Sequence, residues 1–578
     1  MATVATQLIG ALERSGVRRV YGLPGDSLNG FTDAIRRSDG VSWQHVRHEE
    51  NAAFAAAAYA ALTGGLAVCA GSCGPGNLHL INGLFDANRS RVPVLAIAAH
   101  IPRAEIGSEY FQETHPQDLF RECSVYCELV STPEMAPRII AMAMRAAVEE
   151  NGVAVVVIPG EIFLAPAQDS GWLAAPIVPT RSVVRPDDAS LRRAADLLNA
   201  AERVTILGGA GVAGAHEALI RAAATLNAPV VHALRGKEFV EYDNPFDVGM
   251  TGLLGFASGY KAIKESDVLL MLGTDFPYGQ FYPDHGRIIQ VDVRGQNLGR
   301  RAPIELGLVG TVADTLAALQ PLLMQKADRA HLDEALQHYR KTRKTLDGLA
   351  VNDRDRSPIR PEYVAAVADR LATEDAVFTV DVGSPVVWAA RYLTMNGQRR
   401  LVGSFNHGSM ACALPHAIGA QTAFPYRQVV ALAGDGGLAM SFGELITLTQ
   451  NRLPVKLIVF NNSSLNFVEL EMKAAGIVNF GTELVNPDFS AVARAMGLFG
   501  RRVEHPADLE SALAEAFAHD GPAVIDVVTA RQELSIPPAI TAEQAKGFSL
   551  YAIRTIMAGR ADELLDLVTT NVARRLLD

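Results

Sequence analysis

The sequence predicts an α/β protein: three doubly wound parallel-sheet domains, followed by a C-terminal tail with an amphipathic helix. Two observations lead to this class. Apolar, strand-like runs alternate with helical patterns along most of the chain, which indicates parallel sheets covered by helices. Two stretches, one irregular (168–185) and one charged and mostly helical (326–352), interrupt this alternation and read as linkers. We therefore expect domains at 1–182, 183–334 and 335–530, with the tail at 531–578.

The composition is that of a globular protein and argues against some partners and compartments. The 578 residues are 49% hydrophobic and 20% charged, a length that suits three or four ordinary domains. The formal net charge of −11 argues against nucleic acid bound to a basic face. Five cysteines are too few, and odd in number, for a disulfide framework, so we expect a reducing compartment. Cys69-x₃-Cys73 and Cys123-x₃-Cys127 could be metal ligands, but without a second pair at zinc spacing buried thiols are favoured.

The first region places an unusual acidic pair between a strand and a helix. Strands are expected at 19–23, 43–46, 66–70, 92–98 and 153–158, after a helix at 3–15. Glu49 and Glu50 lie between the strand 43–46 and the uncharged, alanine-rich helix 52–62. Capping of the helix by both acids is one interpretation. The other is that one carboxyl group points inward beside the helix, where it would suit proton transfer near neutral pH.

The second region carries glycine and polar residues at the ends of its strands. The strand 204–207 meets Gly209-Ala-Gly211-Val-Ala-Gly214, which we expect to open a helix and which fits a dinucleotide fingerprint. No acid follows the next strand, 229–234, for a ribose hydroxyl. Later strands run into Gly273-Thr274-Asp275-Phe276 and end at Asp292. An adenine nucleotide across these ends, with Asp292 on a ribose, is one interpretation, and a plain structural α/β layer is the other.

The third region contains a βαβ unit with polar residues where its strands end. The strand 429–433 meets Gly434-Asp435-Gly436-Gly437, and the strand 455–460 ends in Asn461-Asn462. Because carboxyl ends of parallel strands lie on one edge, we expect Asp435 and Asn462 close together. Their oxygens suit Mg²⁺, and the glycines let a phosphate approach the backbone. A tight turn followed by a polar strand end is the alternative. An earlier strand, 376–380, likewise ends in Asp381-Val-Gly383.

The tail departs from the α/β pattern. It contains Pro537-Pro538 and a helical pattern from about Ala561. Four apolar residues fall on one face of that helix: Leu565, Val568, Val572 and Leu576. A short amphipathic helix of this kind could lie in a membrane interface or dock on the protein's own surface, and both interpretations stay open.

Together these motifs resemble the thiamine-diphosphate- and FAD-dependent pyruvate oxidase family, within the group that includes acetolactate synthase. The GDG…NN pattern from Gly434 to Asn462 is similar to the group's signature for thiamine diphosphate and Mg²⁺, and the His-Glu pair near residue 50 fits as well. Over essentially the whole chain the likeness is to the quinone-dependent pyruvate dehydrogenases of bacteria. It is carried by RHEE at 47–50, CAGSCGPGNLHLINGLFD at 69–86, YFQETHPQ at 110–117, HALRGKE at 232–238, GSFNHGSM at 403–410 and AKGFSLY at 545–551.

The resemblance implies pyrimidine-binding, FAD-binding and pyrophosphate-binding domains with assigned site residues. Glu49 would hydrogen-bond the aminopyrimidine, and Phe111, Gln112 and Phe467 would lie near the substrate. Asp435, Asn462 and the carbonyl of Ser464 would hold Mg²⁺. Further contacts to thiamine diphosphate are implied for Gly408, Ser409, Met410, Gly436, Gly437, Ser463, Leu465, Asn466 and Val468. FAD contacts are implied for Thr251, Gly252, Leu253, Leu254, Thr274, Asp275, Phe276, Pro277, Tyr278 and Asp292.

The implied activity is oxidative decarboxylation of pyruvate to acetate and CO₂, with electrons passed through FAD to ubiquinone. The resemblance also implies a homotetramer in which Glu49 and Asp435 meet across a dimer interface. It implies a cytoplasmic protein, peripheral on the inner face of the cell membrane, that binds phospholipid through its tail. Two departures stand out: the tail is more acidic and lacks tryptophan, and Glu469 adds a charge near the presumed pocket, altering substrate handling or facing solvent.

Three rival interpretations remain. The first is a non-redox enzyme of the same group, such as a decarboxylase or an acetolactate synthase with idle FAD. The second is a phosphate-dependent oxidase that forms acetyl phosphate and peroxide. The third, a non-catalytic nucleotide-binding or scaffold protein, is disfavoured by the joint presence of Glu49, Asp435 and Asn462.

Overall fold

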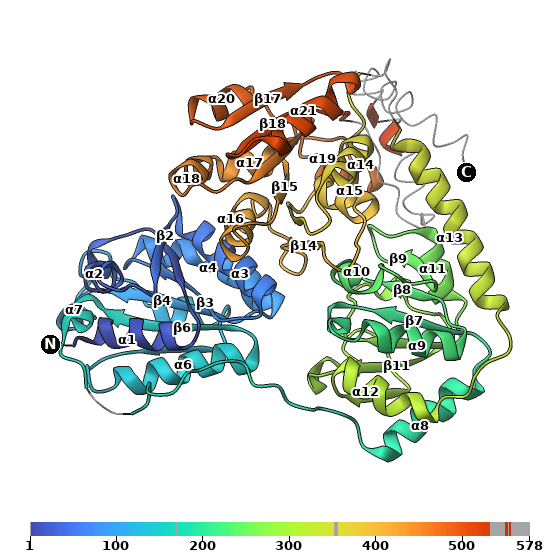
Figure 1. The fold of residues 1–578 in the computed structure, drawn as a ribbon, viewed down its shortest axis with the longest axis horizontal. Helices are drawn as coiled ribbons and strands as arrows, with labels where there is room; N and C mark the ends of the chain where they lie inside the picture. The colour runs from blue at the N-terminus through green and yellow to red at the C-terminus, as the bar shows by residue number, and fades with distance from the viewer. Residues whose placement is uncertain (1, 169–170, 352–356, 532–549, 553, 556–578) are drawn as a thin grey trace.

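The computed structural model describes residues 2–168, 171–351, 357–531, 550–552 and 554–555. In this part of the chain, three six-stranded sheets each carry helices on their faces, and every pair of neighbouring strands is parallel (Figure 1). The predicted α/β class with three parallel sheets is therefore confirmed. The predicted tail helix lies outside the described residues.

The first sheet has the strand order β2-β1-β3-β4-β6-β5. Its strands are β1 (Arg19–Gly22), β2 (Ser42–His45), β3 (Ala67–Gly71), β4 (Val94–His100), β5 (Tyr126–Leu129) and β6 (Val153–Pro159). Its principal helices are α1 (Val4–Arg14), α2 (Asn29–Arg36), α3 (Glu49–Thr63), α4 (Pro75–Ser90) and α6 (Ala136–Glu150). Helix α3 begins three residues before the expected start. The reason is that His48 caps it: its Nδ1 accepts a hydrogen bond from the Glu50 N–H at 3.2 Å.

The second sheet has the order β12-β11-β10-β7-β8-β9, the order of sheets that bind dinucleotides. Its strands are β7 (Val204–Gly208), β8 (Val230–His232), β9 (Asp247–Met250), β10 (Val268–Leu272), β11 (Arg287–Asp292) and β12 (Leu306–Val309). Its principal helices are α8 (Asp188–Ala200), α9 (His216–Leu226), α11 (Ala257–Lys264) and α12 (Val312–Leu319). We expected the glycine run to open a helix, but it does not do so directly. A 3₁₀ turn follows Gly209, and α9 begins after Gly214. Gly211 instead donates to the Gly273 carbonyl at 3.0 Å, just beyond the ends of the neighbouring parallel strands β7 and β10.

The third sheet has the order β14-β13-β15-β16-β18-β17, the same relative order as the first sheet. Its strands are β13 (Val377–Val380), β14 (Arg400–Gly403), β15 (Val429–Gly434), β16 (Lys456–Asn461), β17 (Phe499–Val503) and β18 (Ala523–Val528). Its helices are α14 (Pro361–Leu371), α15 (Ser384–Tyr392), α16 (Ala413–Ala423), α17 (Asp435–Met440), α18 (Leu445–Gln450), α19 (Asn466–Ala474), α20 (Phe489–Ala495) and α21 (Pro506–Ala518).

Helix α3 is buried between α4 and α16, so one hydrophobic core extends from the first sheet to the third. The uncharged sequence of α3 follows from this position, because both of its faces are covered. The contact with α16 is backbone-close: a Cβ at Gly419 would lie 2.1 Å from the carbonyl oxygen of Ala55. Only glycine fits at that crossing.

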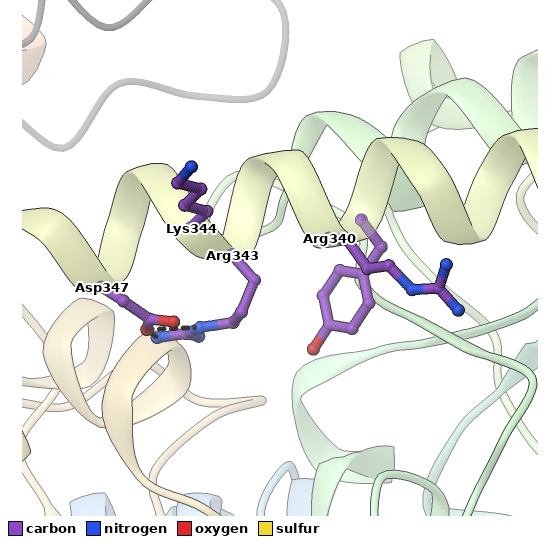
Figure 2. A pocket seen from close by; sticks show the side chains of 5 residues that line it. Arg340, Arg343, Lys344 and Asp347 are labelled. Atoms are coloured by element: carbon purple, nitrogen blue, oxygen red, sulfur yellow. Dashed lines mark hydrogen bonds and ion pairs between the residues drawn. The ribbon is translucent and has the colours of Figure 1, made fainter.

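The charged stretch expected as a second linker forms a 20-residue helix, α13 (Ala330–Leu349). Its first turns pack on the second sheet through Leu332. Further along, Arg343 bonds Asp347 and donates to the carbonyl of Arg391 in α15 at 2.6 Å (Figure 2). The helix thus bridges two sheets. Figure 2 also shows the side chains of Arg340 and Lys344 pointing in different directions, so this basic run does not converge on one ligand.

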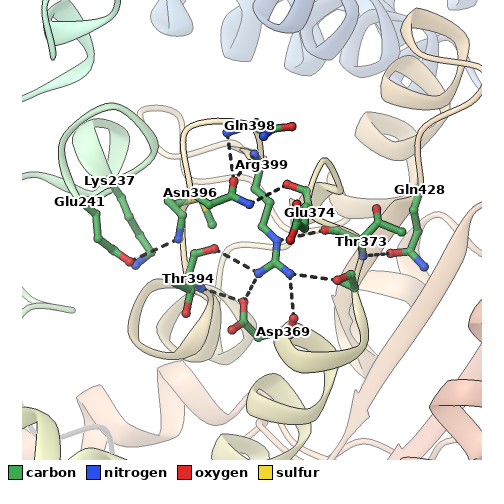
Figure 3. A network of polar contacts seen from close by, with 12 residues as sticks. Lys237, Glu241, Asp369, Thr373, Glu374, Thr394, Asn396, Gln398, Arg399 and Gln428 are labelled. Carbon is green, nitrogen blue, oxygen red and sulfur yellow. Dashed lines mark hydrogen bonds and ion pairs between the residues drawn. The ribbon is translucent and has the colours of Figure 1, made fainter. Parts of the chain in front are cut away.

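Arg399, which is almost completely buried, binds the end of α14 close to a second contact between the second and third sheets (Figure 3). Its guanidinium donates to Asp369 Oδ1 at 2.7 Å and to the Ala372 and Thr373 carbonyls at 3.0 and 3.1 Å. These bonds satisfy acceptors at the end of α14 that the helix itself leaves free. Nearby, Glu241 from beyond β8 accepts a hydrogen bond from the Met395 N–H at 3.3 Å. The second and third sheets are therefore joined by polar contacts as well as by α13.

Candidate active site

A cavity of about 230 Å³ lies at the carboxyl edge of the third sheet, where β13 and β15 end. The beginnings of three helices line it: α15 at Gly383–Pro385, α17 at Gly434–Gly437 and α19 at Leu465–Val468. The free N–H groups and the dipole at a helix N-terminus attract anions. In sheets of this kind ligands bind where neighbouring strands lead to opposite faces, as β13 and β15 do here. The cavity therefore suits a phosphate-bearing ligand.

Asp435 lies buried at the wall of this cavity. Its carboxylate accepts hydrogen bonds from Gly436, Asn462 and Ser463 N–H groups at 2.8, 3.1 and 2.7 Å, and from Asn486 Nδ2 at 2.8 Å. Within the described residues, no lysine or arginine forms an ion pair with it. Burial raises the pKa of Asp435. A buried carboxylate held only by N–H dipoles is a site that a cation would stabilise.

Asn462 and Ser464 line the same cavity. The Asn462 Oδ1 accepts a hydrogen bond from the Ser464 N–H at 3.0 Å, which leaves a second lone pair for a ligand. Between them, Ser463 has a φ of 55°, so the chain turns sharply after β16. Asp435, Asn462 and the Ser464 carbonyl together offer only oxygen donors, the kind that Mg²⁺ prefers. The residues present therefore fit the expected cation.

Most residues expected to contact thiamine diphosphate line this single cavity. They are Gly408, Met410, Asp435, Gly436, Gly437, Asn462, Ser464, Leu465, Asn466, Phe467 and Val468. Ser409 and Ser463 do not line it. Ser409 instead accepts a hydrogen bond from Asn82 Nδ2 in α4 at 3.1 Å, and Asn82 also bonds Glu50 and His407.

Asp381 is a cavity residue to which the sequence assigned no role. Its Oδ1 accepts from the Ala413 N–H at 2.8 Å, and its Oδ2 accepts from the Gly434 N–H at 3.2 Å. Burial raises its pKa to about 6. Its position also explains Gly437, because a Cβ there would lie 2.2 Å from Asp381 Oδ2. The polar end of β13 was the available signal; other lining residues, such as Trp388, carried no local motif.

Glu49 and Glu50 have separate roles. Glu49 is buried at the first position of α3, and its Oε2 lies 3.0 Å from His79 Nδ1. The rings of His48 and His79 stack at 4.2 Å between centroids. Glu50 instead accepts from Asn82 at 2.6 Å. The structure thus places one acid inward and uses the other to hold a neighbouring helix. Glu49 is not among the residues lining the Asp435 cavity.

Phe111 and Gln112 lie on a loop at the carboxyl edge of the first sheet. Glu113 holds the loop by accepting from the Gly107 N–H at 2.5 Å. Gln112 has a φ of 64°, and its Oε1 accepts a hydrogen bond from Cys73 Sγ at 3.3 Å. Phe111 is 78% exposed. These two residues therefore lie apart from the Asp435 cavity within one chain.

The residues expected to contact FAD gather at the carboxyl edge of the second sheet. Residues 251–254 follow β9, residues 274–278 follow β10, and Asp292 ends β11. The Thr251 Oγ1 is buried and has no hydrogen-bond partner among the described residues. Such a group fits a ligand that would complete its bonding. Asp292 is buried and accepts from the Arg294 N–H at 2.8 Å.

Two sequence expectations about single residues are resolved by burial. Glu469 neither faces solvent nor lines the cavity: it is fully buried, and Ser464 Oγ donates to it at 2.5 Å. The five cysteines are free thiols, four of them buried and Cys127 partly so. As for membranes, none of the helices in the described ranges has both the length and the apolar character needed to cross one.

Comparison with known proteins agrees with this geometry. Three thiamine pyrophosphate enzyme models match: the N-terminal TPP binding domain at 2–119, the central domain at 191–319 and the C-terminal TPP binding domain at 381–527. A Bacillus subtilis protein named as containing thiamine pyrophosphate is 35% identical over 96% of both chains. A pyruvate oxidase of Lactiplantibacillus plantarum is 32% identical over 90% of this chain and 87% of its own.

A third relative has a different named activity. The large subunit of acetolactate synthase isozyme 2 of Escherichia coli is 31% identical over 90% of this chain and 95% of its own. The three family models, the long relatives and the cavity with its oxygen donors all agree. This chain belongs to the thiamine pyrophosphate enzyme family.

Proposed function

We propose that this chain is a pyruvate oxidase that uses thiamine diphosphate, Mg²⁺ and FAD and passes electrons to ubiquinone. The reaction is oxidative decarboxylation of pyruvate to acetate and CO₂. The observation that carries the proposal is the cavity in which three helix N-termini meet the oxygen donors of Asp435, Asn462 and Ser464. The similarity to a pyruvate oxidase over most of both chains supports pyruvate as the substrate.

The residues around the cavity divide the work of holding the cofactor. Asp435, Asn462 and Ser464 would hold the cation, and the N–H groups that begin α15 and α19 would bind the diphosphate. When bound, thiamine diphosphate supplies the thiazolium that stabilises the carbanion left by decarboxylation. Glu49 contacts His79 through Oε2. Its Oε1 would then hydrogen-bond the aminopyrimidine and exchange a proton with that ring.

A second subunit would complete the site. Glu49, Phe111 and Gln112 lie outside the Asp435 cavity of their own chain, and Phe111 is exposed. Near that cavity Val468 of α19 is exposed too, as is Phe480 in the loop that follows the helix. Apolar side chains of this kind favour burial against a partner. We assign them to a dimer interface, within a homotetramer, that brings Glu49 of one subunit to Asp435 of the other.

FAD is assigned to the carboxyl edge of the second sheet. This assignment is supported by the strand order, by the buried Asp292 and by the Thr251 hydroxyl, which has no hydrogen-bond partner in the described part of the chain. Ubiquinone as acceptor, phospholipid binding by the tail and a position on the inner face of the cell membrane rest on the sequence resemblance. The domain limits 1–182, 183–334, 335–530 and 531–578 belong to the same proposal.

Anaerobic addition of pyruvate to the purified holoenzyme tests the redox assignment. Rapid bleaching of the flavin absorbance, with acetate formed after reoxidation by a ubiquinone analogue, is the expected result. Acetolactate or acetaldehyde with the flavin still oxidised would instead establish the non-redox alternative, which the acetolactate synthase similarity keeps in view. If the rate depends on phosphate and acetyl phosphate is the product, phosphate rather than water is the final nucleophile.

Membrane association needs its own experiment. The full chain and a truncation at Glu533 are sedimented with phospholipid vesicles, with and without pyruvate. Co-sedimentation of the full chain alone supports the assignment of the tail. Equal behaviour of both proteins would remove the tail from membrane binding.

A further inference from the structure

A buried ion pair is joined to the proposed cation site through the side chain of Ser464. Glu469 and Lys473, one turn apart in α19, are both almost inaccessible to solvent, and their charged groups are 2.9 Å apart. Arg531 Nε also donates to Glu469 Oε2 at 3.3 Å, so two cationic side chains contact this carboxylate. A buried pair of this kind gives little net stability over apolar residues of the same size, so its retention points to a positional role.

Glu469 is the side-chain anchor of the loop that follows β16. Its Oε2 accepts from Ser464 Oγ at 2.5 Å, and its Oε1 accepts from Asn479 Nδ2 at 3.3 Å. The backbone ties the same two segments together, because the Leu465 N–H donates to the Thr482 carbonyl at 2.8 Å. The carboxylate thus joins Ser464, in the loop that follows β16, to Asn479 in the segment that follows α19. Ser464 can neither rotate nor withdraw without breaking the bond to Glu469.

We propose that Glu469 is a positioning residue for the cation: through the Ser464 hydroxyl it fixes the loop so that the Ser464 carbonyl and Asn462 are ready to bind Mg²⁺. The inference rests on the proposed function and deepens it. Lys473 and Arg531 both form ion pairs with this carboxylate, and a hydrogen bond from Ser464 to an ion-paired carboxylate is a strong, charge-assisted one. Loss of a group that orients a metal ligand in this way typically lowers metal affinity about 10- to 100-fold.

Cofactor binding tests the inference without relying on turnover. Trp388 lines the cavity, so its fluorescence reports binding of thiamine diphosphate as Mg²⁺ is added to the apoprotein. Ser464→Ala removes the hydroxyl and keeps the carbonyl, whereas Ser464→Thr keeps both; neither change adds or removes a charged side chain. We expect Ser464→Ala to lower the apparent affinity for Mg²⁺ about 10- to 100-fold, and Ser464→Thr to keep an affinity near that of wild type. Excess Mg²⁺ should restore the fluorescence change in Ser464→Ala.

Glu469→Ala and the double variant Ser464→Ala/Glu469→Ala complete a double-mutant cycle for Mg²⁺ affinity. If the two side chains act as a unit, the double variant loses no more affinity than either single variant. Asp267→Asn is the control, because it breaks an ion pair with Arg203 in the second sheet and should leave Mg²⁺ affinity unchanged. A wild-type protein without Mg²⁺-dependent binding would overturn the proposed function itself. Wild-type binding that survives unchanged in Ser464→Ala overturns the role of Glu469, whether or not Glu469→Ala folds.

Discussion

The carboxyl group of Asp381 gives the third sheet a dependence on pH that one substitution should remove. Its pKa rises from the ordinary value of 3.8 to about 6 because the side chain is buried. The folded protein therefore binds this proton more tightly than the unfolded chain. The resulting stabilisation is fully present below pH 3.8 and is lost as the pH rises through about 6. At 1.36 kcal/mol per tenfold change in proton affinity, it amounts to about 3 kcal/mol.

Asp381→Asn cannot ionise and so removes this dependence. It also loses one acceptor oxygen, which leaves the N–H of Ala413 or Gly434 unpaired at a cost of about 1–3 kcal/mol at every pH. The absolute stability of the variant mixes both effects. The difference between wild type and variant at two pH values isolates the proton. Roughly half of the effect, about 1.4 kcal/mol, lies between pH 5 and pH 8.

Urea unfolding at pH 5 and pH 8, followed by tryptophan fluorescence, to which Trp388 of the third region contributes, and with a chelator present, measures that difference. The chelator prevents a cation from binding next to Asp435 during the titration. We expect the advantage of wild type over Asp381→Asn to shrink by about 1.4 kcal/mol from the lower to the higher pH. An advantage that is the same at both pH values would refute the raised pKa of Asp381.

Three further predictions concern other elements of the chain. Glu49→Gln should slow pyruvate-dependent flavin reduction by roughly 10²–10⁴, as for a lost proton-transfer group, and near-wild-type turnover would remove Glu49 from the mechanism. Cys73→Ala should raise KM for pyruvate more than it lowers kcat, because the thiol orients the Gln112 amide; Cys73→Ser should keep the bond, and equal values in both variants would contradict that role. Gly419→Ala should lower the free energy of unfolding by about 1–3 kcal/mol in urea titrations, because its Cβ meets the Ala55 carbonyl, and an unchanged midpoint would refute this close packing.

The sequence was most informative where strands are buried on both faces. β4, β6 and β15 are nearly continuous apolar runs, and all three were predicted to within two residues at each end. The edge strands β5, β12 and β17 were missed, because partly exposed strands alternate too weakly to stand out from loops.

In the candidate site too, some features could be predicted from the sequence and others depend on the fold. Asp435 and Asn462 could be paired from sequence because each directly follows a strand, and parallel strands end on one edge. Asp381 also follows a strand, but its role depends on the backbone of Ala413, brought close only by the fold. The surroundings of Glu469 likewise depend on a contact with Asn479, ten residues away in the chain. Local spacing does not predict such contacts.

The shared strand order of the first and third sheets accounts for the two halves of the proposed site. In each sheet the chain leaves the third strand through a glycine-rich loop: 71–76 after β3 and 434–437 after β15. One loop carries Asp435 and lines the cavity. The other closes around Glu49, so that a Cβ at Gly76 would lie 3.1 Å from Glu49 Oε1.

In the proposed site, equivalent edges of two similar sheets would thus supply different residues to one reaction. The α3–α16 contact joins these sheets through helices on their faces rather than through the edges themselves. Both edges thereby stay available to a second chain. A two-fold pair would bring each Glu49 to the Asp435 cavity of its partner and complete two identical sites at once. A protein mixed from Glu49→Gln and Asp435→Asn subunits tests this arrangement. Each mixed dimer should regain one intact site, whereas either variant alone should have none, and no recovery on mixing would place both residues in a single chain's site.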